Sequence, residues 1–153
     1  MELSDLYNPS LVSIGLEAAD KDDVFASIGQ LLVDAGKVTD ITRFIADVQA
    51  REASYSTGVG GGLAIPHAKS PVVTDACYAI ANLASPFKWD EDDDEPTTLI
   101  VLLAVPSEQA GTTHLKMLSR LSVALMDEVF RAALVNAKSE LEINNAILSK
   151  EGK

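Results

Sequence analysis

Cysteine is almost absent from this sequence, since Cys77 is the single one among 153 residues. A lone cysteine cannot close an internal disulfide, and a reducing, cytoplasmic location is therefore expected. Long apolar runs are also missing: the longest, residues 99–105, is far shorter than the roughly 18 to 20 residues of a membrane span. Residues 1–5 are acidic where a secretory signal would be positive. Membrane insertion and secretion are thus not expected.

Basic residues are scarce as well. Lys and Arg together number 12 against 23 for Asp and Glu, which gives a net charge of −11 at pH 7. Nucleic-acid binding is excluded as a function class, because neutralising phosphates requires clustered Lys and Arg. Six consecutive acids, residues 90–95, supply most of the excess. Their mutual repulsion predicts a solvated loop; steering of a basic carrier protein is the alternative, and the spacing supports no metal site.

What the sequence does have is a glycine-rich run that leads into a proline and a histidine. Glycines permit positive φ and close approach of the backbone to a ligand, and backbone amides can form an anion-binding nest. Pro66 fixes its own φ and favours an extended Ile65, so His67 is expected to point in a defined direction at the end of a strand. The candidate phosphate loop consists of Thr57, Gly58, Gly60, Gly61 and Gly62.

Two common phosphate-binding motifs are excluded at this run. Counting from Gly58, Leu63 stands where both the P-loop and the dinucleotide fingerprint need a glycine. The residue types alone equally fit a plain glycine turn beside a core histidine. A functional role for His67 therefore rests on the segments around it.

Those segments resemble, in the same order, the enzyme IIA domain of the bacterial phosphoenolpyruvate-dependent sugar phosphotransferase system, of the fructose, mannitol and nitrogen-regulatory type. They are the Arg51-Glu52 pair with residues 56–58 and 62–69, then Phe87-Lys88-Trp89, residues 103–106 and residues 113–119. The resemblance covers essentially residues 1–150. It implies a single enzyme IIA type domain over residues 1–153.

The hydrophobic periodicity predicts how the elements are arranged. Strands are expected at residues 11–14, 78–83 and 97–104, and helices at residues 20–35, from about 39 to beyond 51, 112–126, near 129–134, and after a Ser139/Glu142 capping box. In the helix at 112–126, one face is expected to hold Leu115, Leu118, Leu121 and Leu125. Helices before and after the central strands predict an α/β fold: a mixed central β-sheet with helices packed on both faces, in three layers.

His67 is the predicted nucleophile. A neutral imidazole nitrogen attacks phosphorus in line and forms a phosphohistidine that another nucleophile can discharge. The other ring nitrogen must hold the proton, and a hydrogen bond to a carbonyl would set that tautomer; the resemblance implies attack through Nε2. Phosphoryl transfer requires mainly positioning and charge stabilisation, so no nucleotide, metal or other cofactor is expected.

Two further residues complete the predicted site. By resemblance, His114 stabilises the phosphoryl group at the start of a helix, where amides and dipole favour phosphate, and Arg51 holds its oxygens through two parallel hydrogen bonds. From residue types alone, His114 is equally a capping or surface residue, and Arg51 an exposed charge paired with Asp47. Two histidines and a remote Cys77 form no recognisable zinc ligand set. Glu52 is interpreted as structural.

The resemblance also implies the partners. The donor is the phosphohistidine of the carrier HPr, and the acceptor is a cysteine of an enzyme IIB that serves a membrane enzyme IIC. Cys77 suits a buried inert thiol rather than that acceptor. The predicted function is a phosphotransferase that relays phosphoryl groups toward a fructose-type or related sugar permease. The alternatives are a regulatory module of the nitrogen branch and a relative in anion transporters that lacks phosphorylation, against which His67, His114 and Arg51 together argue.

Overall fold

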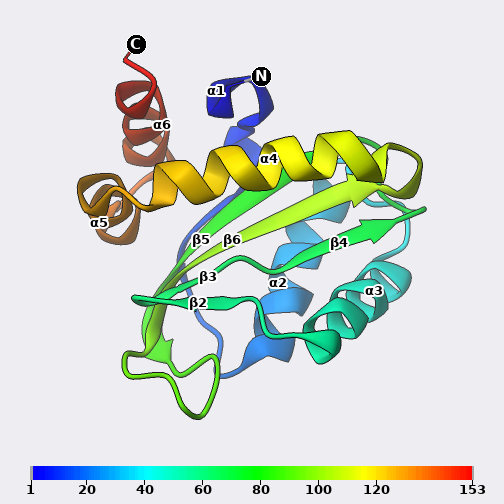
Figure 1. Ribbon diagram of the computed structural model, residues 1–153, viewed down its shortest axis with the longest axis horizontal. Helices are drawn as coiled ribbons and strands as arrows, with labels where there is room; N and C mark the ends of the chain where they lie inside the picture. The colour runs from blue at the N-terminus through cyan, green and yellow to red at the C-terminus, as the bar shows by residue number, and fades with distance from the viewer. Residues whose placement is uncertain (1, 153) are drawn as a thin grey trace.

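A six-stranded mixed sheet forms the centre of the computed structural model, which describes residues 2–152 apart from the side chains of residues 109–111, 113 and 114 (Figure 1). The strands are β1 (Val12–Leu16), β2 (Gly58–Gly60), β3 (Leu63–Ala64), β4 (His67–Ser70), β5 (Cys77–Phe87) and β6 (Thr97–Pro106). The order is β1-β5-β6-β3-β2, and β4 also pairs with β6. The β5–β6 and β2–β3 pairs are antiparallel, whereas β1, β3 and β4 run parallel to their neighbours β5 and β6.

Helices cover both faces of this sheet, so the predicted three-layer α/β fold is confirmed. Figure 1 shows α4 lying across one face, with α2 on the opposite side and α3 beside β4. The helices are α1 (Leu3–Leu6), α2 (Lys21–Asp34), α3 (Ile41–Ser54), α4 (Ala110–Leu125), α5 (Glu128–Asn136) and α6 (Glu140–Lys150), with short 3-10 turns η1 (Pro9–Leu11) and η2 (Ser107–Gln109). None of the helices in the described part of the chain combines the length and apolarity needed to cross a bilayer.

The strand β6 explains why both faces are covered. Alternate residues of β6 belong to two separate cores: Leu99, Val101 and Leu103 pack toward α4, while Ile100 and Leu102 pack toward α2 and α3. A strand buried on both faces has a continuous apolar sequence, which is the uninterrupted run seen at residues 99–105. The predicted central strand is therefore confirmed.

Local signals set the helix boundaries as predicted. Asp20 caps α2 by accepting a hydrogen bond from the Asp23 amide at 2.9 Å, and Gly36, with a φ of 75°, follows the helix end. Ser139 caps α6 by accepting from the Glu142 amide. The capping box is only half formed, however, because the Glu142 carboxylate accepts from the Lys138 amide instead of the Ser139 amide.

Three expectations about position were wrong. His67 begins strand β4 rather than ending a strand, since the Ile65-Pro66 step separates it from β3. Helix α4 begins at Ala110, so residue 114 is its fifth residue and not its start. Leu115 does not share the buried face of α4: its side chain is 64% exposed, whereas Met117 is 1% exposed. The buried stripe runs through residues 117, 121, 124 and 125, and a residue two positions before this stripe points to the opposite side of a helix.

This orientation of α4 predicts different stabilities for two leucine truncations. Leu121→Ala should lower the free energy of unfolding by about 2 to 5 kcal/mol, because it opens a cavity in the core. Leu115→Ala, the matched control on the same helix, should change it by no more than about 0.5 kcal/mol. Urea unfolding of both variants measures the difference; a larger loss for Leu115→Ala would mean that the helix is rotated.

Candidate functional site

His67 lies at the beginning of β4, at the edge of the sheet, and is 9% exposed. Its register partner on β6 is Leu103, which faces α4. The ring nitrogen Nδ1 lies 3.0 Å from the carbonyl oxygen of Ile65. A carbonyl oxygen only accepts hydrogen bonds, so in the neutral ring the proton is on Nδ1 and Nε2 keeps a lone pair. The backbone bond thus selects the tautomer whose Nε2 is nucleophilic.

Arg51 approaches the other side of the imidazole. It lies in the last turn of α3, and its Nε donates to Nε2 of His67 at 3.1 Å. Its Nη1 donates to the carbonyl oxygen of Tyr55 at 2.7 Å. Asp47, the alternative partner considered for Arg51, instead forms an ion pair with Arg43 at 3.0 Å. The structure therefore brings Arg51 and His67 together.

A surface cavity of about 510 Å³ opens over this pair. It is lined by Asp47, Arg51, His67, Ala68, Lys69 and Leu118, so α3, β4 and α4 all contribute to it. Residue 114 lies one turn of α4 before Leu118. The side chain of His114 is outside the described part of the chain, and its predicted role stays a prediction.

The surroundings of His67 keep its ring neutral. Burial, the largest cause, lowers its pKa below the ordinary value of 6.5, the bond to the Ile65 carbonyl opposes this shift, and the positive charge of Arg51 lowers the pKa further. The imidazole is therefore mostly uncharged at pH 7, and its Nε2 lone pair accepts the hydrogen bond from Arg51 Nε.

The structure does not bring the glycine turn to His67. Gly60, Gly61 and Gly62 all have positive φ and form the β2–β3 turn. Strand β3 starts opposite Leu99 of β6, whereas His67 lies opposite Leu103, so about 13 Å of strand separates them. The tight turn explains the positive φ of these glycines, and a side chain at Gly62 would in addition crowd Thr98.

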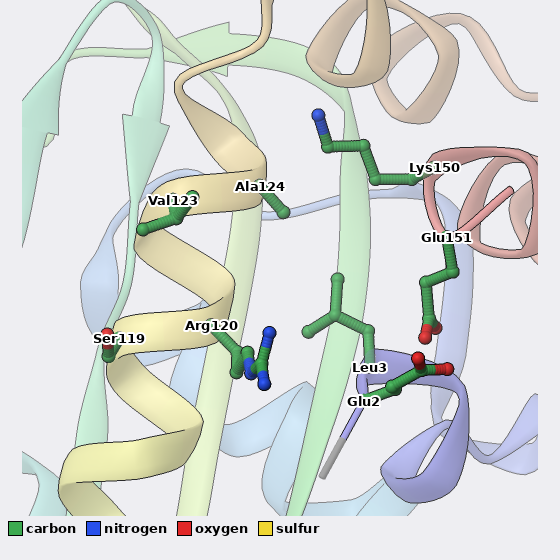
Figure 2. A pocket seen from close by; sticks show the side chains of 8 residues that line it. All are labelled: Glu2, Leu3, Ser119, Arg120, Val123, Ala124, Lys150 and Glu151. Atoms are coloured by element: carbon green, nitrogen blue, oxygen red, sulfur yellow. The ribbon is translucent and has the colours of Figure 1, made fainter.

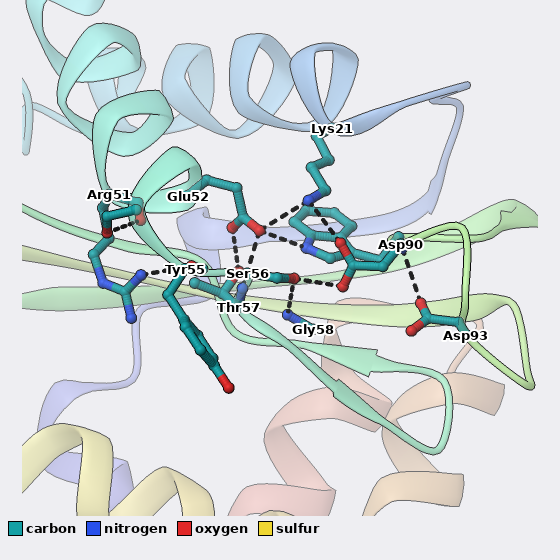
Figure 3. Close-up of polar contacts among 11 residues, drawn as sticks. Lys21, Arg51, Glu52, Tyr55, Ser56, Thr57, Gly58, Asp90 and Asp93 are labelled. Atoms are coloured by element: carbon teal, nitrogen blue, oxygen red, sulfur yellow. Dashed lines mark hydrogen bonds and ion pairs between the residues drawn. The ribbon is translucent and has the colours of Figure 1, made fainter.

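The two other residues of the candidate phosphate loop have engaged amides. The Thr57 amide donates to Glu52 at 2.9 Å, and the Gly58 amide donates to the Ser56 hydroxyl at 3.1 Å (Figure 3). Neither amide is directed at a ligand in this arrangement. The sequence identified a distinctive loop here, but the loop shapes the chain before His67 instead of surrounding it.

The acidic run is solvated except at Asp90 and at Asp93, which is half-buried and accepts a hydrogen bond from the Asp90 amide at 3.0 Å. Glu91, Asp92, Asp94 and Glu95 are exposed, as predicted. Asp90 differs, because it accepts hydrogen bonds from Lys21 at 3.1 Å and from the Ser56 hydroxyl. It ties the start of the loop to α2 and to the segment before β2.

Cys77 does not provide a second reactive group. Cys77 is 2% exposed, and burial raises its pKa to about 12, so its thiol is inert as predicted. Within residues 2–152, as far as they are described, no group of three or more His, Cys, Asp or Glu side chains is placed to hold a metal ion.

A second hollow lies between α1, α4 and the C-terminal end of α6, away from His67 (Figure 2). Apolar side chains of Leu3, Val123 and Ala124 line it together with Arg120, and the carboxylates of Glu2 and Glu151 stand at its edge. The Glu151 carboxylate accepts from the Ser4 amide and so joins the chain's two ends. No histidine or cysteine is among the residues that line this hollow, whereas His67 and Arg51 line the cavity described above.

The three-layer fold is that of phosphotransferase IIA domains. The crystal structure of nitrogen regulatory protein IIA-Ntr from Neisseria meningitidis superimposes with a TM-score of 0.83 at 29% identity, covering 94% of this chain and 97% of that one. Residues 5–150 match the family model described as "Phosphoenolpyruvate-dependent sugar phosphotransferase system, EIIA 2". The chain belongs to this family and is a phosphotransferase-system EIIA phosphoryl-relay domain.

Two relatives differ in how much of their length matches this chain. The 2-O-alpha-mannosyl-D-glycerate-specific EIIABC component of Escherichia coli (strain K12) is 33% identical over 153 residues, which is 99% of this chain but 23% of that protein. The fructose-specific EIIA component of Haloferax volcanii (strain DS2) is 34% identical over 146 residues, 95% of this chain and 94% of that one. This chain thus spans about a quarter of the first relative and nearly all of the second.

The arrangement of Arg51 predicts the direction in which its removal shifts His67. Arg51→Ala should raise the pKa of His67, because a nearby positive charge that disfavours the imidazolium is lost. Arg51→Lys is the control, since it keeps the charge and should leave the pKa closer to that of the unmodified protein. An NMR titration of the His67 ring measures both; an unchanged or lower pKa in Arg51→Ala would contradict the geometry.

Proposed function

We propose that residues 1–153 form one EIIA-type domain that accepts a phosphoryl group from phospho-HPr on Nε2 of His67 and passes it to a cysteine of an enzyme IIB. The observation that carries the proposal is the bond from His67 Nδ1 to the Ile65 carbonyl, which leaves Nε2 as the nucleophile in an open cavity. Family membership supports the chemistry. The name EIIABC of the E. coli relative supports a IIB acceptor and a IIC membrane component.

The transfer balances without a cofactor. The Nε2 lone pair attacks phosphorus in line, the bond from phosphorus to the donor imidazole breaks, and its electron pair returns to the donor ring. No proton leaves Nε2, because it carries none. Positive charge develops on the His67 ring, and the Nδ1 proton then forms a stronger bond with the Ile65 carbonyl. Attack by a IIB thiolate on phosphorus reverses these changes.

Arg51 changes partner during this step. Its Nε points at the lone pair of His67 Nε2, which the new bond to phosphorus consumes. The guanidinium, already held at Tyr55, then lies next to the phosphoryl oxygens and can donate two parallel hydrogen bonds to them. We assign His114 as a further donor, on its position one turn before Leu118 and on the resemblance.

The substrate system is the finer part of the proposal. We assign the domain to a relay for a fructose-type or related sugar, supported by the Haloferax relative, which it matches over nearly the whole length of both chains and which is named fructose-specific. The second candidate is a regulatory role, supported by the similarity to IIA-Ntr of Neisseria meningitidis. Genes for IIB and IIC components beside this one would favour the sugar relay. In either case we place the domain in the cytoplasm with HPr.

Labelling tests the proposed nucleophile. Incubation with phosphoenolpyruvate, enzyme I and HPr should add one phosphoryl group, seen by intact mass and lost in acid. His67→Ala should abolish this label while the circular dichroism spectrum stays the same, because His67 sits at a sheet edge outside both cores. A label that survives in His67→Ala would contradict the assignment.

Rapid-quench kinetics test His114. If His114 donates to the transferring group, His114→Ala should still be labelled on His67, but transfer should slow by on the order of 10²-fold to 10³-fold. The loss falls on rate because the bond that the donor makes is strongest in the transition state. A normal transfer rate with a lowered melting temperature would return His114 to a structural role.

A further inference from the structure

One buried carboxylate organises the segment between α3 and β2. Glu52, whose side chain is 7% exposed, accepts hydrogen bonds from four donors. The Thr57 amide and Lys21 Nζ each lie 2.9 Å from Oε2, Trp89 Nε1 lies 3.1 Å from it, and the Thr57 hydroxyl reaches Oε1 (Figure 3). These donors come from three places far apart in the sequence, so Glu52 holds them together.

A continuous series of hydrogen bonds leads from this carboxylate to the nucleophile. The Thr57 amide donates to Glu52, and the Thr57 carbonyl accepts from the Ile65 amide at 3.0 Å. The Ile65 carbonyl in turn accepts from His67 Nδ1. The amide and the carbonyl of one residue belong to different peptide groups, so these bonds act together by fixing where the backbone lies at Thr57 and Ile65. The position of Glu52 therefore bears on the carbonyl that fixes the His67 tautomer.

The Glu52 carboxylate also holds in place the segment whose Tyr55 carbonyl accepts a hydrogen bond from Arg51. Arg51 is the neighbour of Glu52 on α3, and its Nη1 donates to the Tyr55 carbonyl. Tyr55 lies between Glu52 and Thr57 in the sequence. The Glu52 carboxylate accepts two hydrogen bonds from Thr57, one from its amide and one from its hydroxyl. The loop 52–57 is thus closed at both ends, and the Tyr55 carbonyl has a set position for the guanidinium.

The carboxylate remains charged in this setting. Burial opposes the ionised form, but hydrogen bonds from Thr57 and Lys21 outweigh burial and hold the pKa of Glu52 below its usual range. Lys21 is in turn shared with Asp90, and its ammonium lies 5.2 Å from the Trp89 ring. A charged acceptor forms stronger bonds than a neutral one, so the segment it holds is rigid.

We propose that Glu52 is a positioning residue for phosphoryl transfer, which through Thr57 sets the His67 tautomer on one side and the Arg51 guanidinium on the other. This rests on the function proposed above. Glu52 touches neither reacting atom; it acts through the Ile65 and Tyr55 carbonyls. A misplacement of about 1 Å in a reacting group can cost on the order of 10²-fold in rate.

Glu52→Ala and Glu52→Gln separate positioning from simple stability. Glu52→Ala removes the acceptor of the Thr57 amide, and transfer from phospho-HPr should slow by about 10-fold to 100-fold. The ring ¹⁵N shifts of His67 should change from a single Nδ1–H tautomer to a mixture. Glu52→Gln keeps one oxygen for the Thr57 amide and Trp89, so it should recover most of the rate and the single tautomer.

Asn82→Ala is the matched control. Asn82 is another buried polar side chain with three bonds, to the Gly15 amide and to the carbonyls of Leu134 and Ala137, and it lies in the other part of the sheet. Its loss should lower the melting temperature but leave the transfer rate and His67 tautomer unchanged. If Glu52→Ala does not fold, Thr57→Val against Thr57→Ser gives the comparison, with a slower rate and a mixed tautomer expected in the valine variant alone.

The outcomes are distinguishable. If the unmodified protein is not labelled on His67, the proposed function fails whatever Glu52 does. If it is labelled, and Glu52→Ala loses melting temperature but keeps both the rate and the His67 spectrum, the positioning role is overturned. A slow Glu52→Ala that Glu52→Gln does not rescue, beside an equally slow Asn82→Ala, would also overturn it, because the loss would then follow stability.

Discussion

The hydrogen bond from His67 Nδ1 to the Ile65 carbonyl is the contact on which the proposed chemistry of this domain depends. An imidazole that exchanged freely between tautomers would present a protonated Nε2 part of the time, and a protonated nitrogen has no lone pair for phosphorus. The bond joins residues only two positions apart, and Pro66 between them restricts the backbone that brings ring and carbonyl together. The order Ile65-Pro66-His67 therefore itself favours the tautomer that carries its proton on Nδ1.

The position of β4 in the sheet makes the His67 ring accessible. Strand β4 pairs with β6 and leaves its other edge toward α3, so a side chain there receives groups from two layers. Arg51 comes from α3 and Leu118 from α4, and both line the cavity with His67. A histidine on β6 itself would be covered on both faces. The edge position combines burial sufficient to lower the pKa of His67 with an open cavity of about 510 Å³ beside the ring.

Periodicity and end signals predicted the layers well, because they act over a few residues: Asp20 and Gly36 bound α2, and the run at 99–105 is the central strand. They failed where the outcome depended on distant contacts. The exposure of Leu115 follows from how α4 lies on the sheet, and helix periodicity leaves that rotation open. The proposed role of Glu52 depends on Lys21 and Trp89, 31 and 37 positions away, so its place beside Arg51 was the available signal. Glycine is favoured both where a turn requires positive φ and where the backbone approaches a ligand, so the glycine run by itself did not distinguish a tight turn from a phosphate loop.

In the proposed mechanism, the positive charge of Arg51 has opposite effects on the protonation and the phosphorylation of His67. As a positive charge beside His67, it disfavours adding a proton to the ring, which preserves the nucleophile. In the proposed transfer, a phosphoryl group brings negative oxygens to the same nitrogen, and the same charge then favours the product. Protonation and phosphorylation compete for Nε2, and they differ in the sign of the charge they deliver. A fixed guanidinium therefore selects phosphoryl over proton without moving far, provided that the carbonyl of Tyr55 holds it in place. The proposed preference of His67 Nε2 for a phosphoryl group over a proton therefore depends on residues 52–57, which the Glu52 carboxylate holds in place.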